Sequence, residues 1–309
     1  MHRAGLDGHT VVARDVVLAA VTRTELEDAC SAGTVVADDQ WVGLDDVATA
    51  ENAIADEVLG LAAEGRLAVV LGQVPDSAEV YVVPAVHRLS LEELAGALQQ
   101  APPDGPVVIA GDPDELPART PGAALRDLLS WGALPVRDLR PDPAGGPTLG
   151  RLPVALRRGE LLDPSPQDHS LVVVPCADDS QVVLRAQQLV ADSIPRVFGD
   201  VDVLVLTPLR RGTAGQVALS QALPGTAVLT VHEAVGVRAD AVVACFPGQA
   251  AGVLSRALVY SCATRAITHL SVLTAAGQEL PGAVARGLGP ARNTRLGSLL
   301  AAAAHDDQF

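Results

Sequence analysis

Residues 107–117 read Val-Val-Ile-Ala-Gly-Asp-Pro-Asp-Glu-Leu-Pro, and this stretch decides the class of fold. Its apolar first half has the length and β-branched content of a buried strand, and Gly111-Asp112 ends that strand. An acidic turn flanked by Pro113 and Pro117 follows. In open α/β sheets, ligands bind at the carboxyl ends of the strands. The stretch therefore predicts a buried strand and a loop that either contacts a ligand or is an ordinary Asp-Pro turn.

Short apolar strands alternate with helices on both sides of this stretch. The other strands are expected at residues 67–71, 80–83, 134–139, 171–174, 203–206, 227–230, 241–245 and 270–273, and helices at 91–99, 181–191, 215–222 and 255–263. Nearly continuous apolar strands that alternate with helices are typical of parallel sheets covered on both faces. The sequence thus predicts an α/β fold with two parallel-sheet lobes in series.

The first part of the chain has a helical pattern instead. Residues 16–64 are expected to be mainly helical, with short β-branched pieces between residues 34 and 44. Thr24 with Glu27, and Ser90 with Glu93, have the spacing of a capping box at a helix start. We therefore expect a small helical N-terminal domain ahead of the two lobes.

The composition excludes several mechanisms. All 22 basic residues are arginines, so no lysine can serve in a phosphate loop, a Schiff base or general-base catalysis. The net charge is −15, and residues 1–100 account for −12 of it, with 17 acidic residues and 5 arginines. Such a field opposes polyphosphate binding, so any nucleic-acid contact is expected in the second lobe, and a protein partner at the acidic N-terminal third.

The remaining composition points to a reduced compartment. Cysteines are scattered singly and show no metal-ligand spacing, so we expect neither disulfides nor a metal site. No apolar run is long enough to span a membrane, and we expect no membrane association. The N-terminus lacks the apolar core of a signal peptide, and the protein is expected to be cytoplasmic.

Three further motifs connect these elements to a known family. The stretch from residue 107 continues through Thr120-Pro121-Gly122 to Gly132-Ala133-Leu134-Pro135-Val136, and resembles motif III of RecD-like superfamily 1 DNA helicases, GDxDQLPSVGPGxVLxDLIxSGxVPV. Residues 203–220 are similar to the opening of the second lobe in that family. Residues 230–243 resemble motif V, TVHKSQGxExDxVV, and residues 258–266 resemble motif VI, LLYTAxTRAR.

The resemblance implies two RecA-like lobes, the second of the UvrD/RecD C-terminal type. The implied domains are the helical N-terminal domain (1–64), a truncated first lobe (65–165), the second lobe (166–276) and a flexible tail (277–309). By position in the motifs, nucleotide would contact Gly111, Asp112, Glu115, Gly236 and Arg265, and DNA would contact Arg210, Arg211, Thr230 and His232. Each of these residues can also have a purely structural role. Arg265, for instance, can pair with an acid, and Asp112 can bond within its own turn.

The departures from the family concern catalysis. No GxxxxGK[ST] loop is present, and the strand that resembles Walker B ends in Pro84-Ala85 instead of Asp-Glu. Phosphoryl transfer needs a phosphate cradle, a metal ion and a positioned water. We therefore identify no catalytic residue and expect no cofactor. ATP and Mg²⁺ would bind only if the chain is a nucleotide-dependent enzyme, the second function below.

Three functions are compatible with these observations. The first is a helicase-like protein without a competent ATPase site that acts as a non-catalytic binding or regulatory subunit, in DNA metabolism. The second is a nucleotide-dependent helicase or ATPase whose site is atypical or completed by a partner. The third is a DNA-binding protein that does not hydrolyse nucleotide. Whether the chain is an enzyme stays open at this point.

Overall fold

The computed structural model describes residues 1–74, 79–141, 146–165, 167–234, 236–287 and 292–306. The chain divides into two compact units, each with its own parallel sheet. The first unit comprises Met1–Pro113, Pro117–Arg140 and Pro290–Phe309, and the second comprises Asp114–Leu116 and Pro141–Gly289. Because the chain leaves the first unit and later returns to it, the N-terminal and C-terminal segments both belong to the first unit.

The first unit is built on a four-stranded parallel sheet in the order β5-β6-β4-β7. Its strands are β4 (Leu67–Leu71), β5 (Tyr81–Val83), β6 (Val107–Gly111) and β7 (Val136–Asp138). Leu67 is paired with Val107, and Val69 with Val136. The strands predicted around residues 67, 80, 106 and 134 are thereby confirmed.

Helices pack on one face of this sheet. They are the 3-10 turn η1 (Val86–Arg88) and the helices α4 (Asp45–Ala63), α5 (Leu91–Gln99), α6 (Ala124–Trp131) and α13 (Leu296–Asp306). Ile54, Val58, Leu94 and Leu98 face the core with at most 1% of their surface exposed. Each such side chain contributes roughly 1.5–3 kcal/mol by leaving water.

The opposite face of the first sheet takes no part in this core. It carries Ala68, Val70, Val108 and Ala110, the strand positions that alternate with the core residues. Val70 and Ala110 are nevertheless buried, with 8% and 3% of their surface exposed, so this face is covered in part.

The N-terminal region is less helical than predicted. It contains α1 (His2–Leu6), α2 (Arg14–Leu18) and α3 (Arg23–Ser31), together with β1 (Val11–Ala13), β2 (Val35–Ala37) and β3 (Trp41–Leu44) in an antiparallel sheet of order β1-β3-β2. The capping box of α3 is formed by Thr22 and Glu25, so the prediction of Thr24 with Glu27 was wrong. Both pairs have the same spacing, and Thr22 is the one with extended backbone. The box at Ser90 and Glu93 is confirmed.

The second unit has a five-stranded parallel sheet in the order β10-β9-β11-β12-β8. Its strands are β8 (Leu171–Pro175), β9 (Val203–Thr207), β10 (Ala227–Thr230), β11 (Ala239–Phe246) and β12 (Ala266–Thr274). All five were predicted, with small differences at their ends. The order reverses between β9 and β11, where open α/β sheets place their ligand crevice.

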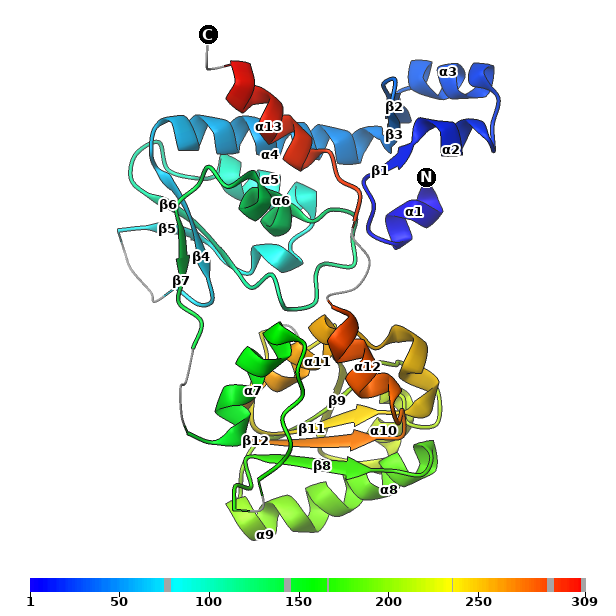
Figure 1. Ribbon diagram of the computed structural model, residues 1–309, viewed down its shortest axis with the longest axis vertical. Helices are drawn as coiled ribbons and strands as arrows, with labels where there is room; N and C mark the ends of the chain where they lie inside the picture. The colour runs from blue at the N-terminus through cyan, green and yellow to red at the C-terminus, as the bar shows by residue number, and fades with distance from the viewer. Residues whose placement is uncertain (75–78, 142–145, 166, 235, 288–291, 307–309) are drawn as a thin grey trace. The chain divides into compact units, whose positions relative to one another are not determined.

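Helices cover both faces of this second sheet. They are α7 (Thr148–Arg158), α8 (Asp179–Gln188) with the π-helical turn η2 (Leu189–Ser193), α9 (Ile194–Phe198), α10 (Gln216–Ala222), the 3-10 turn η3 (Gly248–Val253), α11 (Arg256–Ala263) and α12 (Glu279–Arg286). Helices α7, α11 and α12 pack with Leu204 and Val242 on one face, and α8, α9 and α10 pack with Val205 and Val243 on the other (Figure 1). Alternate residues of one strand thus fill two cores, which explains why the strands are apolar throughout.

The region expected to be a flexible tail is helical and packed, so that prediction was wrong. In the second unit, α12 buries Leu280 and Val284. In the first unit, α13 lies alongside α4 (Figure 1) and buries Leu296 and Leu300 completely. The Gly and Arg content suggested disorder, but leucines at helical spacing bury enough apolar surface to order the segment.

The structure therefore has the predicted class of fold, an α/β chain with two parallel-sheet units. No helix in the described ranges has the length and apolar character that crossing a bilayer requires.

Candidate functional site

Arg210 and Arg211 lie in the loop that follows β9, at the carboxyl edge of the second sheet where the strand order reverses. The Thr207 hydroxyl donates to the carbonyl of Ala214 at 3.0 Å and folds the loop back on its own strand. A Cβ atom at Gly215 would lie 2.5 Å from the carbonyl carbon of Arg211. Only glycine fits there, and the loop is consequently tight.

Arg210 has an acidic neighbour. Its Nη1 atom lies 3.8 Å from Oε1 of Glu233, and 76% of the arginine side chain is exposed. The Glu233 carboxylate is held by the backbone N–H of Thr230 at 3.0 Å and by Nε2 of Gln216 at 2.7 Å. The Thr230 amide is the main cause that lowers the pKa of Glu233 below its ordinary value, with the charge of Arg210 adding. Arg210 thus faces a carboxylate that is ionised at neutral pH.

The end of β10 and the turn after it hold three further residues of the predicted site, Thr230, His232 and Gly236. Thr230 is buried at the end of the strand, and its hydroxyl accepts the N–H of Glu233 at 3.3 Å. His232 is half-buried in this turn and has an interaction partner. Gly236 is exposed and has a φ of +71°, in the left-handed region. The structure thus brings Thr230 and Arg210 together around Glu233.

Arg211 differs from Arg210 in its surroundings. Its side chain is exposed, and among the described residues no carboxylate pairs with it. Of the two arginines in this loop, Arg211 is therefore the one whose charge is available to an anion.

Arg265 follows α11 and is 6% exposed. Its guanidinium donates to Oε2 of Glu115, and the Thr264 hydroxyl donates to Oε1 of the same carboxylate at 3.1 Å. The Ser261 hydroxyl accepts the N–H of Leu116 at 2.9 Å, which fixes the backbone next to Glu115. The short segment 114–116 belongs to the second unit and neutralises the charge of Arg265.

Gly111 and Asp112 belong to the first unit, at the end of β6. The N–H of Asp112 donates to Nδ1 of His87 at 3.0 Å. Oδ1 of Asp112 accepts from Nη1 of Arg140 at 3.0 Å, and Arg140 also pairs with Asp138 at 2.7 Å. A Cβ atom at Gly111 would lie 2.9 Å from Leu125, so the glycine is required by close packing. Asp112 is therefore held by His87 through its backbone and by Arg140 through its side chain.

Arg140 is a residue that sequence reasoning missed. Its side chain is only 12% exposed, and its guanidinium pairs with two carboxylates at the carboxyl edge of the first sheet. Asp138 and Arg140 stand two positions apart at the end of a predicted strand, but that spacing alone does not indicate a third partner from β6. In the folded sheet β4 lies between β6 and β7, and the Arg140 side chain passes Gly72, just after the end of β4, to reach Asp112.

Ala85 follows the strand that resembles Walker B. It has a φ of +52° and is the one described residue other than glycine with a positive φ. A left-handed conformation is uncommon for a residue with a Cβ atom and carries strain. The position that would hold the water-activating acid is thus occupied by a small apolar residue in an unusual turn.

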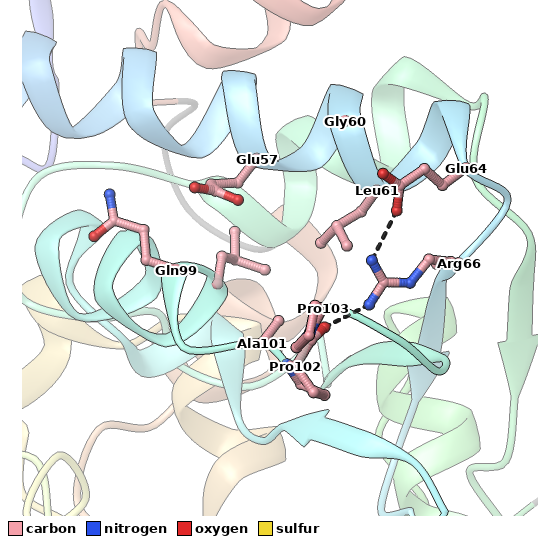
Figure 2. Close-up of a pocket in the computed structure, with 10 residues that line it drawn as sticks. Glu57, Gly60, Leu61, Glu64, Arg66, Gln99, Ala101, Pro102 and Pro103 are labelled. Atoms are coloured by element: carbon pink, nitrogen blue, oxygen red, sulfur yellow. Dashed lines mark hydrogen bonds and ion pairs between the residues drawn. The ribbon is translucent and has the colours of Figure 1, made fainter.

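A pocket lies at the C-terminal ends of α4 and α5 (Figure 2). It is lined by Glu57, Gly60, Leu61, Glu64, Arg66, Leu98, Gln99, Ala101, Pro102 and Pro103. Arg66 donates to Glu64 at 2.7 Å and to the carbonyls of Pro102 and Gly105 at 2.6 and 2.8 Å. Since the guanidinium is occupied by these acceptors, the pocket offers no free cation and no nucleophile. Nowhere in the described residues do three or more metal-binding side chains gather.

Comparisons with known proteins give no family assignment, since no family model matches the chain. Among solved structures, the chain is similar to arterivirus nonstructural protein 10, a helicase, in complex with DNA, with 19% identity and a TM-score of 0.40 over 75% of this chain and 53% of that one. The crystal structure of arterivirus nonstructural protein 10 matches with 16% identity and a TM-score of 0.39, over 80% and 71%. The chain spans about half the length of the first of these. Values this low carry no information about shared function.

Proposed function

We propose that this chain is a degenerate relative of the RecD-like superfamily 1 helicases that does not hydrolyse ATP by itself and acts as a non-catalytic binding or regulatory subunit. The observation that carries the proposal is Arg140 at the carboxyl edge of the first sheet. Of the carboxylates that the described residues place at this edge, Asp112 and Asp138 both pair with its guanidinium. A cation there competes with Mg²⁺ for the same oxygens.

The strand next to β6 supports the same conclusion. By resemblance, the Walker B acids would follow β5, and Pro84 and Ala85 stand in their place. The chain contains no lysine, so no lysine can reach the β- and γ-phosphates of a nucleotide. A site without phosphate cradle, metal ligands and water-orienting acid has no evident route to phosphoryl transfer.

The test is ATP hydrolysis by the full chain with Mg²⁺ and single-stranded DNA. We expect turnover no higher than in a blank without protein. The matched variants are Arg265→Gln, at the position that resembles motif VI, and Arg286→Gln, whose ion pair in the same unit is exposed. Turnover above the blank that falls with Arg265→Gln and not with Arg286→Gln would show a working site and overturn the proposal.

Nucleotide binding separates this proposal from a partner-completed enzyme. We expect calorimetry with ATP up to millimolar concentration to give no binding heat, with or without Mg²⁺. Saturable binding that requires Mg²⁺ would favour the atypical ATPase instead.

We further propose that a protein partner binds the acidic N-terminal third. Helix α2 buries none of its residues, its Val16 is 59% exposed, and the acidic helix α3 follows it in the chain. An apolar side chain within an acidic surface fits a partner segment that is both basic and apolar. Capture of a partner from the native cell should be lost with Glu27→Arg and Asp28→Arg and kept with Asp163→Arg, an exposed acid in the second unit. If all variants capture the partner equally, the proposal that the partner binds this acidic surface is wrong.

A second candidate, DNA binding without hydrolysis, is favoured by Arg211 alone. Its exposed charge stands at the strand-order reversal of the second sheet, in the loop that is similar to the second-lobe opening of the helicases. A mobility shift at low salt that weakens with Arg211→Ala, but not with the exposed control Arg196→Ala, would support it. An unchanged mobility of DNA at low salt would exclude it.

A further inference from the structure

Two carboxylates inside the first unit have oxygen atoms that lack hydrogen-bond partners. In the described part of the chain, the buried side-chain oxygens without a partner are Oε2 of Glu51 and Oδ2 of Asp127. Glu51 lies on α4 and is completely buried, and Asp127 lies on α6. Buried polar atoms in proteins nearly always have a partner, so two such oxygens in one region need an explanation.

Both carboxylates bind the same short segment of the chain. Oδ1 of Asp127 accepts from the hydroxyl of Thr294 at 2.9 Å. Oε1 of Glu51 accepts from the backbone N–H of Arg295 at 2.9 Å and from that of Leu296 at 3.3 Å. Residues 294–296 are consecutive and lead into α13, so the two acids lie close together at the start of that helix. The partial positive charge of a helix N-terminus favours negative groups there, but two carboxylates also repel each other.

Arg295 supplies the nearest positive charge. Its Nη1 atom lies 3.9 Å from Oε2 of Glu51, and the guanidinium also donates to Ala48 and Asn52 and stacks over the ring of Trp41 at 4.2 Å from its centre. This arginine is therefore shared between Glu51 and several neutral acceptors.

The other polar groups around the pair come from α6 and from the two terminal segments. Arg126 of α6 is close enough to lower the pKa of Asp127. Arg292 donates to the carbonyls of Ala118, Thr120 and Gly122. From the N-terminal segment, Thr10 donates to Oε1 of Glu51 at 2.9 Å, and His9 accepts the N–H of Asn293 at 2.9 Å.

Burial opposes ionisation of both acids. Burial raises the pKa of Asp127 to about 7, the negative charge of Glu51 adds to this effect, and the Thr294 hydroxyl and Arg126 oppose it. Burial is also the main cause that raises the pKa of Glu51. A proton on Asp127 removes the repulsion between the two carboxylates and gives one of the two oxygens a hydrogen to donate.

We propose that Glu51 and Asp127 form a proton-dependent latch that holds residues 292–306 on α4 and α6. With a proton on Asp127 the segment is docked, and when both carboxylates are ionised the proton has left to solvent and docking is weakened. Loosening the segment would expose Leu296 and Leu300, which are completely buried in the docked form.

The direction of the pH dependence follows from linkage. The docked form holds the proton up to about pH 7, whereas a solvent-exposed aspartate loses it near pH 4. The docked state therefore binds more protons between these values, and its docking constant falls by up to about tenfold per pH unit as the pH rises from about 4 to about 7. Above that range the constant no longer changes, because Asp127 is ionised in both states.

Trp41 provides a built-in reporter, since Arg295 stacks over its ring. The chain has two tryptophans, so Trp131→Phe leaves Trp41 as the single one. In this background, quenching of Trp41 fluorescence by acrylamide is measured between pH 4.5 and 8.5. We expect quenching to increase up to about pH 7 and then to level off. Asp127→Asn should reduce the increase to the part that Glu51 contributes, whereas Asp56→Asn, an exposed acid on α4, should keep the full increase.

The result that overturns the latch is a pH dependence that is the same in Asp127→Asn and in Asp56→Asn, or no dependence in the parent. If Asp127→Asn does not fold, as judged by circular dichroism, Thr294→Ala replaces it. Loss of the Thr294 hydroxyl removes a bond that lowers the pKa of Asp127, so the midpoint should move to higher pH. An unchanged midpoint in Thr294→Ala would also contradict the latch.

Discussion

Arg265 and Glu115 form an ion pair inside the second unit although they are 150 positions apart in the sequence. The two side chains are only 7% and 11% exposed. Glu115 belongs to a segment of three residues that leaves the first unit after β6 and joins the second. This ion pair holds the segment next to the C-terminal end of α11 and neutralises Arg265.

Replacing Glu115 by glutamine should destabilise the second unit. Arg265 would keep its buried position without a counter-charge, and breaking a buried pair in this way costs about 3–5 kcal/mol. The measurement is urea unfolding of the full chain. Glu279→Gln removes an ion pair that is more than half exposed, and it should change the unfolding free energy by less than about 1 kcal/mol. Equal effects of the two variants would show that the buried pair has no special role in stability.

Asp168 is expected to make α7 sensitive to acid. Its carboxylate accepts from the N–H of Thr148 at the start of α7 and from the N–H of Ser170 at 2.9 Å. The bond from Thr148 is the largest cause that lowers the pKa of Asp168 below its ordinary value. The stabilisation is therefore present above about pH 4 and is lost as the pH falls further.

Asp168→Ala should lower the stability of the second unit by about 1 kcal/mol at neutral pH, the usual effect of losing an N-terminal cap. In this variant, the midpoint of urea unfolding should depend less on pH below about 4 than in the parent. Asp163→Ala, which removes an exposed acid from the same linker, serves as control. A variant with the full acid sensitivity of the parent would rule out this role for Asp168.

His269 should resist protonation. Its Nδ1 lies 2.6 Å from the carbonyl oxygen of His169, which can only accept, so Nδ1 carries the hydrogen and Nε2 accepts from the Ser271 hydroxyl at 2.7 Å. Burial is the main cause that lowers the pKa of His269 below its ordinary value. The unfolded chain therefore binds the proton more readily, and stability falls as the pH decreases below about 6.5. Titration of the histidine ring protons by NMR, with His269→Gln to assign the signal, should give a midpoint below 6.5; a midpoint above 6.5 would contradict the assignment.

Gly215→Ala tests the packing of the arginine loop. A Cβ atom there would lie 2.5 Å from the backbone of Arg211, so the loop must shift. Forced overpacking of this kind costs about 1–3 kcal/mol. Gly252→Ala adds a methyl group where no atom lies within 4 Å and should change stability by less than about 0.5 kcal/mol. If the midpoint of thermal unfolding shifts equally in both variants, the close approach at Gly215 does not contribute to stability.

Much of the fold could be predicted because the deciding signals are local. The apolar run from Val107 and the capping box at Ser90 depend on neighbours in the chain, and both appear in the structure as expected. The prediction of the α3 capping box failed because two neighbouring positions give the same local signal. Thr22 and Thr24 have the same spacing to a glutamate, and only the backbone at Thr22 adopts the cap conformation.

The candidate site was less predictable. The positions of Arg265 and Asp112 were identified from motifs, but their partners Glu115 and Arg140 come from other strands and loops. An arginine that binds a phosphate and one that pairs with a carboxylate have the same sequence signal. Whether these residues contact a nucleotide stays a prediction, and so does DNA contact by Arg210, Arg211, Thr230 and His232.

By itself, the sequence determined the alternation of strands and helices and the absence of a phosphate-loop lysine, because hydrophobic periodicity and residue identity are properties of the chain alone. The tertiary structure decided which charges meet. Packing brings Glu115 to Arg265, Arg140 to two aspartates, and Glu51 and Asp127 to the start of α13. Such pairings depend on distances between residues far apart in the chain, and a local pattern contains no information about those distances.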